Sequence, residues 1–354
     1  MEGKGKQSYY GTMDGLRAIS ALGIVMMHIL VNGGYELEGF VFQRLIPSFT
    51  ELVYLFMLLS SFGMCCGYYE KVLENKISVG EFYSKRFAKI WPFFAFLSIL
   101  DVALSPEKSA CYELFANLTL CFGLLPNANS TVIGVGWFIG AVFVFYLVFP
   151  FFCYLLSDKL RAWFAFGISF LYNVLCQVYF FDKTHVAKSF VPRTNFLYCA
   201  VFFLAGGLIY LYRDKIIAFA KKGQWLLAVL LVGAILGYYS LGSSVLKLLV
   251  TFSLILMCTL GMKHQKLLEN ELTHFLSGIS MEIYLCHMVI FRVAEKLHLV
   301  HIAASQTVSY IVALIVTLLG AICFSVLFRV VLKKLQEIMG QKISSNKERN
   351  QLSV

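Results

Sequence analysis

Apolar runs of about 20 residues recur along almost the whole chain and are separated by short polar segments. A run of this length can cross the hydrocarbon core of a bilayer as one helix. The pattern predicts ten transmembrane helices, near residues 11–31, 51–69, 90–104, 131–156, 161–180, 195–212, 225–242, 244–262, 275–297 and 305–332. We expect the third, which is short, to begin a few residues earlier. A further apolar piece, 112–125, is too short to span and predicts a re-entrant or interfacial helix.

The composition supports an all-α, polytopic membrane bundle. Hydrophobic residues make up 59% of the chain and charged residues 14%, against about 25% charged in soluble domains. Residues 1–10 are too polar for a signal peptide, residues 11–333 form one membrane domain, and residues 334–354 form a polar tail that we expect to be cytoplasmic and disordered. The ten cysteines lie mostly in apolar runs without a CxxC motif. They are expected to be small buried hydrophobes, and no metal site is expected.

The distribution of basic residues predicts the orientation in the membrane. Ten spans place both termini on one side, and a cytoplasmic N-terminus puts 21 of the 30 basic residues in the inner loops. This bias predicts N-in, C-in. The net charge of +10 is then explained by basic residues on the inner side of the membrane. We expect the lipid bilayer as partner and no nucleic-acid groove.

The first apolar run carries the most informative polar residues. Asp14 and Arg17 lie near its start, and His28 follows eleven residues after the arginine. Eleven steps of 100° bring His28 to within about 20° of Arg17 on the helix, roughly 16 Å further along the axis and near mid-bilayer. Ionisable residues within a span indicate a functional site. The alternative is structural: Arg17 snorkels to the surface, and His28 hydrogen-bonds a neighbouring helix.

Two other segments carry candidate residues. In FYSKRFAKIWP, Arg86 and Lys89 precede the third helix and would form a cationic rim for phosphate groups beside Arg17. Topology alone also explains basic residues at this position.

The ninth predicted helix contains Glu282, His287 and Arg292. Ser280, Tyr284 and His287 fall on one face, whereas Glu282 faces elsewhere and Arg292 is expected to snorkel outward. His287 lies about mid-membrane, so the two histidines can meet at similar depth as a general base and its polar partner. An interhelical hydrogen bond that only holds the bundle together is the alternative.

Several motifs, in this order, resemble the acyltransferase-3 family of integral-membrane acyltransferases, which modify sugars and surface polysaccharides. MDGLRAISALGIVMMH is similar to the arginine, ten residues, histidine motif of the family. LFMLLSSF, RFAKIWP, WFIGAVFVFYLVFP and IYLCHM follow and resemble its further motifs. The resemblance spans nearly the whole chain and implies a bundle of ten core helices.

The resemblance implies an O-acetyltransferase. Acetyl-CoA would enter from the cytoplasm, and the acyl group would pass to a glycan or a lipid-linked sugar. His28 would be the catalytic residue with Arg17 supporting it, while Arg86 and Lys89 would hold the phosphates of CoA. The implied location is the plasma (inner) membrane of a bacterium.

We favour direct attack by an acceptor hydroxyl that His28 deprotonates, with His287 as the second residue at that depth, over acylation of His28 itself. Asp14 would orient Arg17, and Trp137, Tyr284 and Glu282 are the other supporting candidates.

The chain departs from the family at some positions. Lys89 stands for the second arginine, Ser61 for the usual glycine, and Val142 and Phe143 occupy the positions of helix-4 glutamates. The departures indicate a different subgroup. The alternative function is a secondary transporter or flippase, in which the intramembrane His, Arg and Glu residues form a proton or substrate pathway.

Overall fold

The computed structural model is all-helical, as the sequence predicts, and no strand occurs in the residues it describes. The structure describes residues 10–104, 106–126, 130–242, 244–262 and 266–351, with side chains up to Ile338 in the last helix. The α-helices are α1 (Thr12–Asn32), α2 (Ile46–Ser48), α3 (Leu52–Leu73), α4 (Val79–Leu104), α5 (Lys108–Thr119), α6 (Trp137–Leu156), α7 (Lys159–Leu175), α8 (Phe196–Leu211), α9 (Arg213–Leu241), α10 (Val245–Gly261), α11 (Glu271–Gly278), α12 (Ser280–Lys296) and α13 (Gln306–Gln351). Short helical turns are η1 (Val41–Leu45), η2 (Phe49–Glu51), η3 (Cys121–Leu124), η4 (Gly134–Gly136), η5 (Cys176–Phe180) and η6 (Pro192–Thr194).

The apolar helices make the chain a multi-pass membrane protein. Within the described ranges, seven helices are long and apolar enough to cross a bilayer, and the bent pair of α11 and α12 is an eighth if it counts as one span. The shorter apolar helices α8 and α10 match two more of the predicted spans. The number ten and the N-in orientation stay predictions. As expected, the third predicted helix begins earlier, at Val79, and α5 with η3 covers the predicted short piece.

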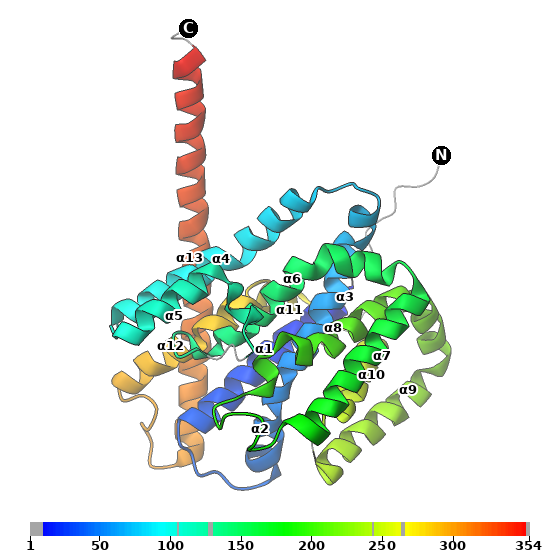
Figure 1. Ribbon diagram of the computed structural model, residues 1–354. Helices are drawn as coiled ribbons and strands as arrows, with labels where there is room; N and C mark the ends of the chain where they lie inside the picture. Colours follow the sequence, from blue (N-terminus) through cyan, green and yellow to red (C-terminus); the bar gives the residue numbers. More distant parts are fainter. Residues whose placement is uncertain (1–9, 105, 127–129, 243, 263–265, 352–354) are drawn as a thin grey trace.

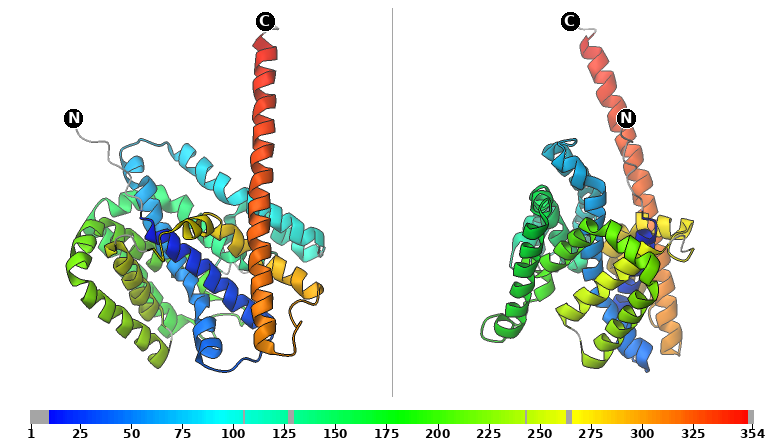
Figure 2. Two further views of the ribbon diagram at one scale, coloured as in Figure 1. Left: turned by 180° about the vertical axis from the view of Figure 1, so that it is seen from behind. Right: turned by 90° about the vertical axis from the view of Figure 1, so that its right-hand side faces the viewer.

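The helices divide into a buried centre and a lipid-facing periphery (Figures 1 and 2). The buried share of the most apolar stretch differs between the spanning segments. It is 72% in the segment that contains α6 and 61% in α1, but only 6% in α9. Large apolar side chains on α7 and α9, such as Leu160 and Trp225, are exposed. In a bilayer these side chains meet lipid, so the outer helices need no protein cover.

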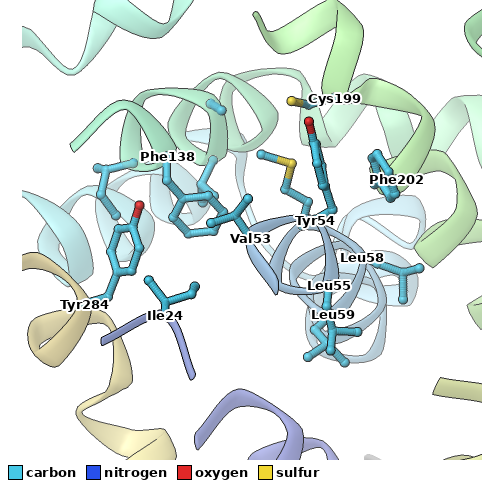
Figure 3. Packing of buried hydrophobic residues seen from close by; sticks show 14 of the residues in the cluster. Ile24, Val53, Tyr54, Leu55, Leu58, Leu59, Phe138, Cys199, Phe202 and Tyr284 are labelled. Atoms are coloured by element: carbon cyan, nitrogen blue, oxygen red, sulfur yellow. The ribbon is translucent and has the colours of Figure 1, made fainter. Parts of the chain in front are cut away.

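The central helices α3 and α8 approach each other closely. A Cβ atom at Gly206 of α8 would collide with the carbonyl oxygen of Leu58 on α3, so glycine allows this approach. The hydroxyl of Ser61 donates to the carbonyl of Phe203 at 2.5 Å across the same contact. Figure 3 shows Leu55, Leu58 and Leu59 of α3 in this core. The small residues of LFMLLSSF therefore serve helix packing here.

Two helices differ from the prediction. The predicted ninth span is broken at Ile279, where α11 and α12 meet at a bend of 67°. The backbone of α13 continues as helix to Gln351 and projects beyond the bundle (Figure 1), where we expected a disordered tail from residue 334. The residues that directly follow the last span, KKLQEIM, are mostly good helix formers, which favours continuation of the helix.

Candidate active site

A cavity of about 370 Å³ lies between α1, α3, α4, α6 and the bent α11–α12 pair. Six residues singled out from the sequence line it together: Asp14, Arg17, Arg86, Lys89, Glu282 and Tyr284. They come from segments up to 270 residues apart. The other side of the cavity is apolar, with Ile139 and Val142 of α6. A ligand with a charged end and an apolar part matches this lining.

Asp14 holds Arg17 at the start of α1. Its Oδ1 accepts a hydrogen bond from the Arg17 guanidinium at 3.2 Å and from the Ser277 hydroxyl at 2.7 Å, and its Oδ2 lies 3.0 Å from Nδ1 of His274. A methyl group added at Gly63 would lie 2.6 Å from Nη2 of Arg17. Asp14 and the glycine thus fix the direction of the guanidinium, as the i, i+3 spacing predicted for the ion pair.

Arg86 and Lys89 supply two further cations to the same cavity. The Arg86 guanidinium donates to the hydroxyl of Tyr68 at 2.6 Å and lies 4.7 Å from the centre of that ring, while its Nε is buried without a hydrogen-bond partner. In the part of the chain that the structure describes, Lys89 has no ion-pair or hydrogen-bond partner. A buried, unpartnered donor and a free ammonium are suited to an anionic ligand.

Glu282 corrects one expectation for the ninth span. It lines the cavity with Ser280 and Tyr284 instead of facing elsewhere. Its Oε1 accepts from Nε of Arg329 at 2.7 Å, and its Oε2 is buried without a partner. Glu282 therefore belongs both to the cavity and to the contact between α12 and α13.

The two histidines meet outside this cavity. Nδ1 of His28 lies 2.7 Å from Nε2 of His287, with the rings within 8° of parallel. His28 is partly exposed, and His287 is fully buried. His28 lies four residues before the last residue of α1, and its depth in the bilayer stays a prediction.

The hydrogen bonds of His287 fix the tautomers of a neutral pair. Nδ1 of His287 lies 3.2 Å from the carbonyl oxygen of Ile283 and has to donate, since a carbonyl only accepts. Nε2 of His287 then accepts, and His28 donates to it from Nδ1. This leaves the lone pair on Nε2 of His28 available for a reacting group. We assign these protons from the hydrogen-bond geometry.

An aromatic layer separates the cavity from the histidine pair. Tyr284 and Phe138 pack edge to face with ring centres 5.4 Å apart, and both line the cavity. The Tyr284 ring lies 6.1 Å from that of His287, and its hydroxyl donates to the carbonyl of Val135 at 2.8 Å. Figure 3 shows Phe138 and Tyr284 facing each other above Ile24 of α1. The cavity thus reaches to within one layer of side chains of the pair.

The remaining candidates, Trp137 and Arg292, do not line the cavity and make other contacts. Trp137 is buried at the start of α6 and does not line the cavity; the guanidinium of Arg193 lies 5.6 Å from its ring. Arg292 does not simply snorkel, because its Nη2 pairs with Asp101 of α4 at 2.6 Å. Within the described chain, no group of three or more His, Cys, Asp and Glu residues could hold a metal ion.

Sequence reasoning missed several partners of these residues. His274 and Ser277 lie on the short α11 and reach α1 only because of the bend. Asp101 and Arg329 are the partners of predicted ionisable residues. One sequence signal could have identified them: a charged residue within or at the end of an apolar run needs a partner of opposite charge.

The comparisons with known proteins identify the class. The family model described as "Acyltransferase domain" matches residues 10–330. The chain therefore belongs to the acyltransferase-3 family and is a membrane acyltransferase. No curated protein and no solved structure matches it.

Proposed function

We propose that the protein transfers an acetyl group from acetyl-CoA to a hydroxyl of a cell-surface glycan or lipid-linked sugar, in the plasma membrane of a bacterium. The observation that carries this proposal is the pairing of a cationic cavity with a histidine pair one side-chain layer away. Arg17, Arg86 and Lys89 are arranged to bind phosphate groups. The length of the arm between the phosphates and the thioester suits the axial separation of Arg17 and His28, about 16 Å for eleven residues.

In this proposal His28 is the general base. Its Nε2 takes the proton of the acceptor hydroxyl as the oxygen attacks the thioester carbonyl carbon. The carbon–sulfur bond then breaks, and the departing thiolate receives the proton from His28. His287 is a positioning residue that holds the tautomer of His28. Lys89 holds phosphate as a point charge, in contrast to the bidentate fork of an arginine.

The test is CoA release from acetyl-CoA by purified protein in detergent, with and without sugar acceptors. We expect acceptor-dependent release by the intact chain and a loss of at least 100-fold in His28→Ala, the scale of a general base. His185→Ala is the matched control, because His185 lies on an exposed loop beside Asp182. Retained transfer in His28→Ala would refute the mechanism. Absence of release by the intact chain with every acceptor would favour the transporter alternative.

A further inference from the structure

The proposed transfer develops a negative charge that the cavity cations cannot reach. When the acceptor oxygen attacks, the carbonyl oxygen of the acyl group becomes an oxyanion beside His28. Arg17 lies eleven residues earlier on α1, about 16 Å along the axis. Arg86 and Lys89 line the same distant cavity. A different donor is therefore needed at the histidine pair.

Arg193 does not line the cavity that holds these cations. It is the central residue of η6, the turn before α8. Nη1 of Arg193 donates to the hydroxyl of Thr50 at 2.6 Å, and the guanidinium lies over the ring of Trp137. The thiol of Cys199 donates to the backbone carbonyl of Arg193 at 3.1 Å. The short turn, with proline before the arginine, gives the side chain a fixed base.

A chain of ring contacts connects Arg193 to the histidines. Trp137 and Phe138 are 6.1 Å apart between ring centres, and Phe138 contacts Tyr284, which packs beside His287. The charge of Arg193 acts on His28 as well as on Tyr284. This series of rings leads from Arg193 to His287 outside the phosphate-binding cavity. A second route leads to α1, because Phe49 and Leu52, which flank Thr50, pack against Gly23, five residues before His28.

Most of the donors of Arg193 have no hydrogen-bond partner among the residues that the structure describes. Of the five N–H groups of a guanidinium, one donates to Thr50. Glu51 is close enough to feel the charge, but no carboxylate among the described residues lies within ion-pair distance of Arg193. Arg193 is half-buried. A half-buried cation with free donors beside a base is suited to stabilise an anion.

We propose that Arg193 stabilises the oxyanion that forms on the acyl carbonyl at His28. The inference rests on the proposed acyl transfer. The acceptor hydroxyl gives its proton to His28, the new carbon–oxygen bond forms, and the carbonyl electron pair moves onto the oxygen that Arg193 holds. The pair returns when the carbon–sulfur bond breaks and CoA leaves with the proton. Trp137 and Thr50 act as positioning residues that hold the guanidinium.

The experiment compares Arg193→Gln and Arg193→Lys in the CoA-release assay, with Arg44→Gln as the matched control. Arg44 is an exposed arginine whose contact is the carbonyl of Tyr239. We expect kcat to fall roughly 100-fold or more in Arg193→Gln, the scale of one lost oxyanion donor, and less in Arg193→Lys, which keeps the charge. Acetyl-CoA affinity, measured by calorimetry, should not change, because the phosphates bind elsewhere.

The outcomes separate this inference from the proposed function. An intact chain without transfer activity defeats both. If the intact chain is active and the kcat of Arg193→Gln lies within about threefold of it, only the role of Arg193 is refuted. The same holds if the substitution changes only the KM of the acceptor. If Arg193→Gln does not fold, Thr50→Val is the second variant. It removes the hydrogen bond that fixes the guanidinium, and we expect kcat to fall several-fold; an unchanged kcat would overturn the inference.

Discussion

One hydrogen bond joins His287 to His28, and this bond defines which nitrogen of His28 keeps a free lone pair. The carbonyl of Ile283 holds Nδ1 of His287 as a donor, so Nε2 of His287 accepts. A base that is held in one tautomer needs no rearrangement before it takes a proton. In contrast, Arg17 pairs with Asp14 of its own helix, and Ser277 and His274 of α11 contact the same carboxylate.

We expect His287→Ala to lower kcat about 100-fold without changing the affinity for acetyl-CoA, because His28 loses the acceptor that orients it. His287→Gln should retain more activity, since its side-chain oxygen can accept from Nδ1 of His28. Steady-state kinetics and calorimetry measure both effects. Equal losses in the two variants, with a matching fall in melting temperature, would instead assign His287 a structural role.

At the scale of elements, ion pairs between exposed arginines and buried carboxylates connect α12 to its neighbours. Asp101–Arg292 joins α4 to α12, and Glu282–Arg329 joins α12 to α13. Charged groups in a span are costly unless they are paired, so these contacts specify which helices lie side by side. They also fix α12 on both sides of His287. The position of the histidine therefore depends on three helices.

Another carboxylate connects α5 to the segment before α6, outside the spanning helices. Burial raises the pKa of Glu113, but hydrogen bonds from the N–H of Val132 and from Thr131 and Ser130 outweigh it and hold the pKa below 4.5. Four of these bonds, of 2.7 to 2.9 Å, reach Oε2. Since the folded pKa lies below the unfolded value, ionised Glu113 contributes stability above about pH 4.5. That contribution is lost as pH falls through the folded pKa.

We expect Glu113→Gln to lower the melting temperature by roughly 2 °C at pH 7, because a partly exposed carboxylate with several hydrogen bonds contributes only about 1 kcal/mol. The difference from the native chain should shrink below pH 4. Melting curves at several pH values measure this, with Glu107→Gln, an exposed residue just before α5, as the control. A difference that does not depend on pH would contradict the assigned role of the carboxylate.

At the scale of the whole molecule, the two ends of the bundle differ. α1 begins and α13 leaves the bundle at the same end (Figures 1 and 2). The start of α1 lines the cationic cavity, and His28 lies near the other end of this helix, four residues before its last residue. With the predicted orientation, the residues that we propose to bind phosphate face the cytoplasm and the histidine pair lies toward the outside. Donor and acceptor would then reach the reaction from opposite sides of the membrane.

We expect both termini to lie in the cytoplasm, because 21 of the 30 basic residues then occupy inner loops. Protease-cleavable tags at the two ends measure this. Both tags should be cleaved in inverted vesicles and neither in intact cells. Cleavage of one tag from each side would show an odd number of spans, and cleavage of both from outside would reverse the orientation.

The sequence alone determined the helices, the membrane class and part of the site. Hydrophobic runs are local, so they predict spans whatever the helices pack against. The Asp14, Arg17 and His28 stripe is equally local, because the helical period places all three on one face. The family resemblance added an acyltransferase, and the family model confirms it. Helix ends were less predictable, as the early start of α4 and the long α13 show.

Only the tertiary structure decided which distant residues meet. His28 and His287 are 259 residues apart, and their hydrogen bond depends on the packing of α12 against α1. His274 reaches Asp14 because the chain bends at Ile279, which no periodicity in the sequence predicts. Arg193 resembled any other basic residue of an outer loop until η6 placed it over Trp137. Contacts of this kind depend on side-chain packing between elements, whereas the apolar pattern specifies only the elements themselves.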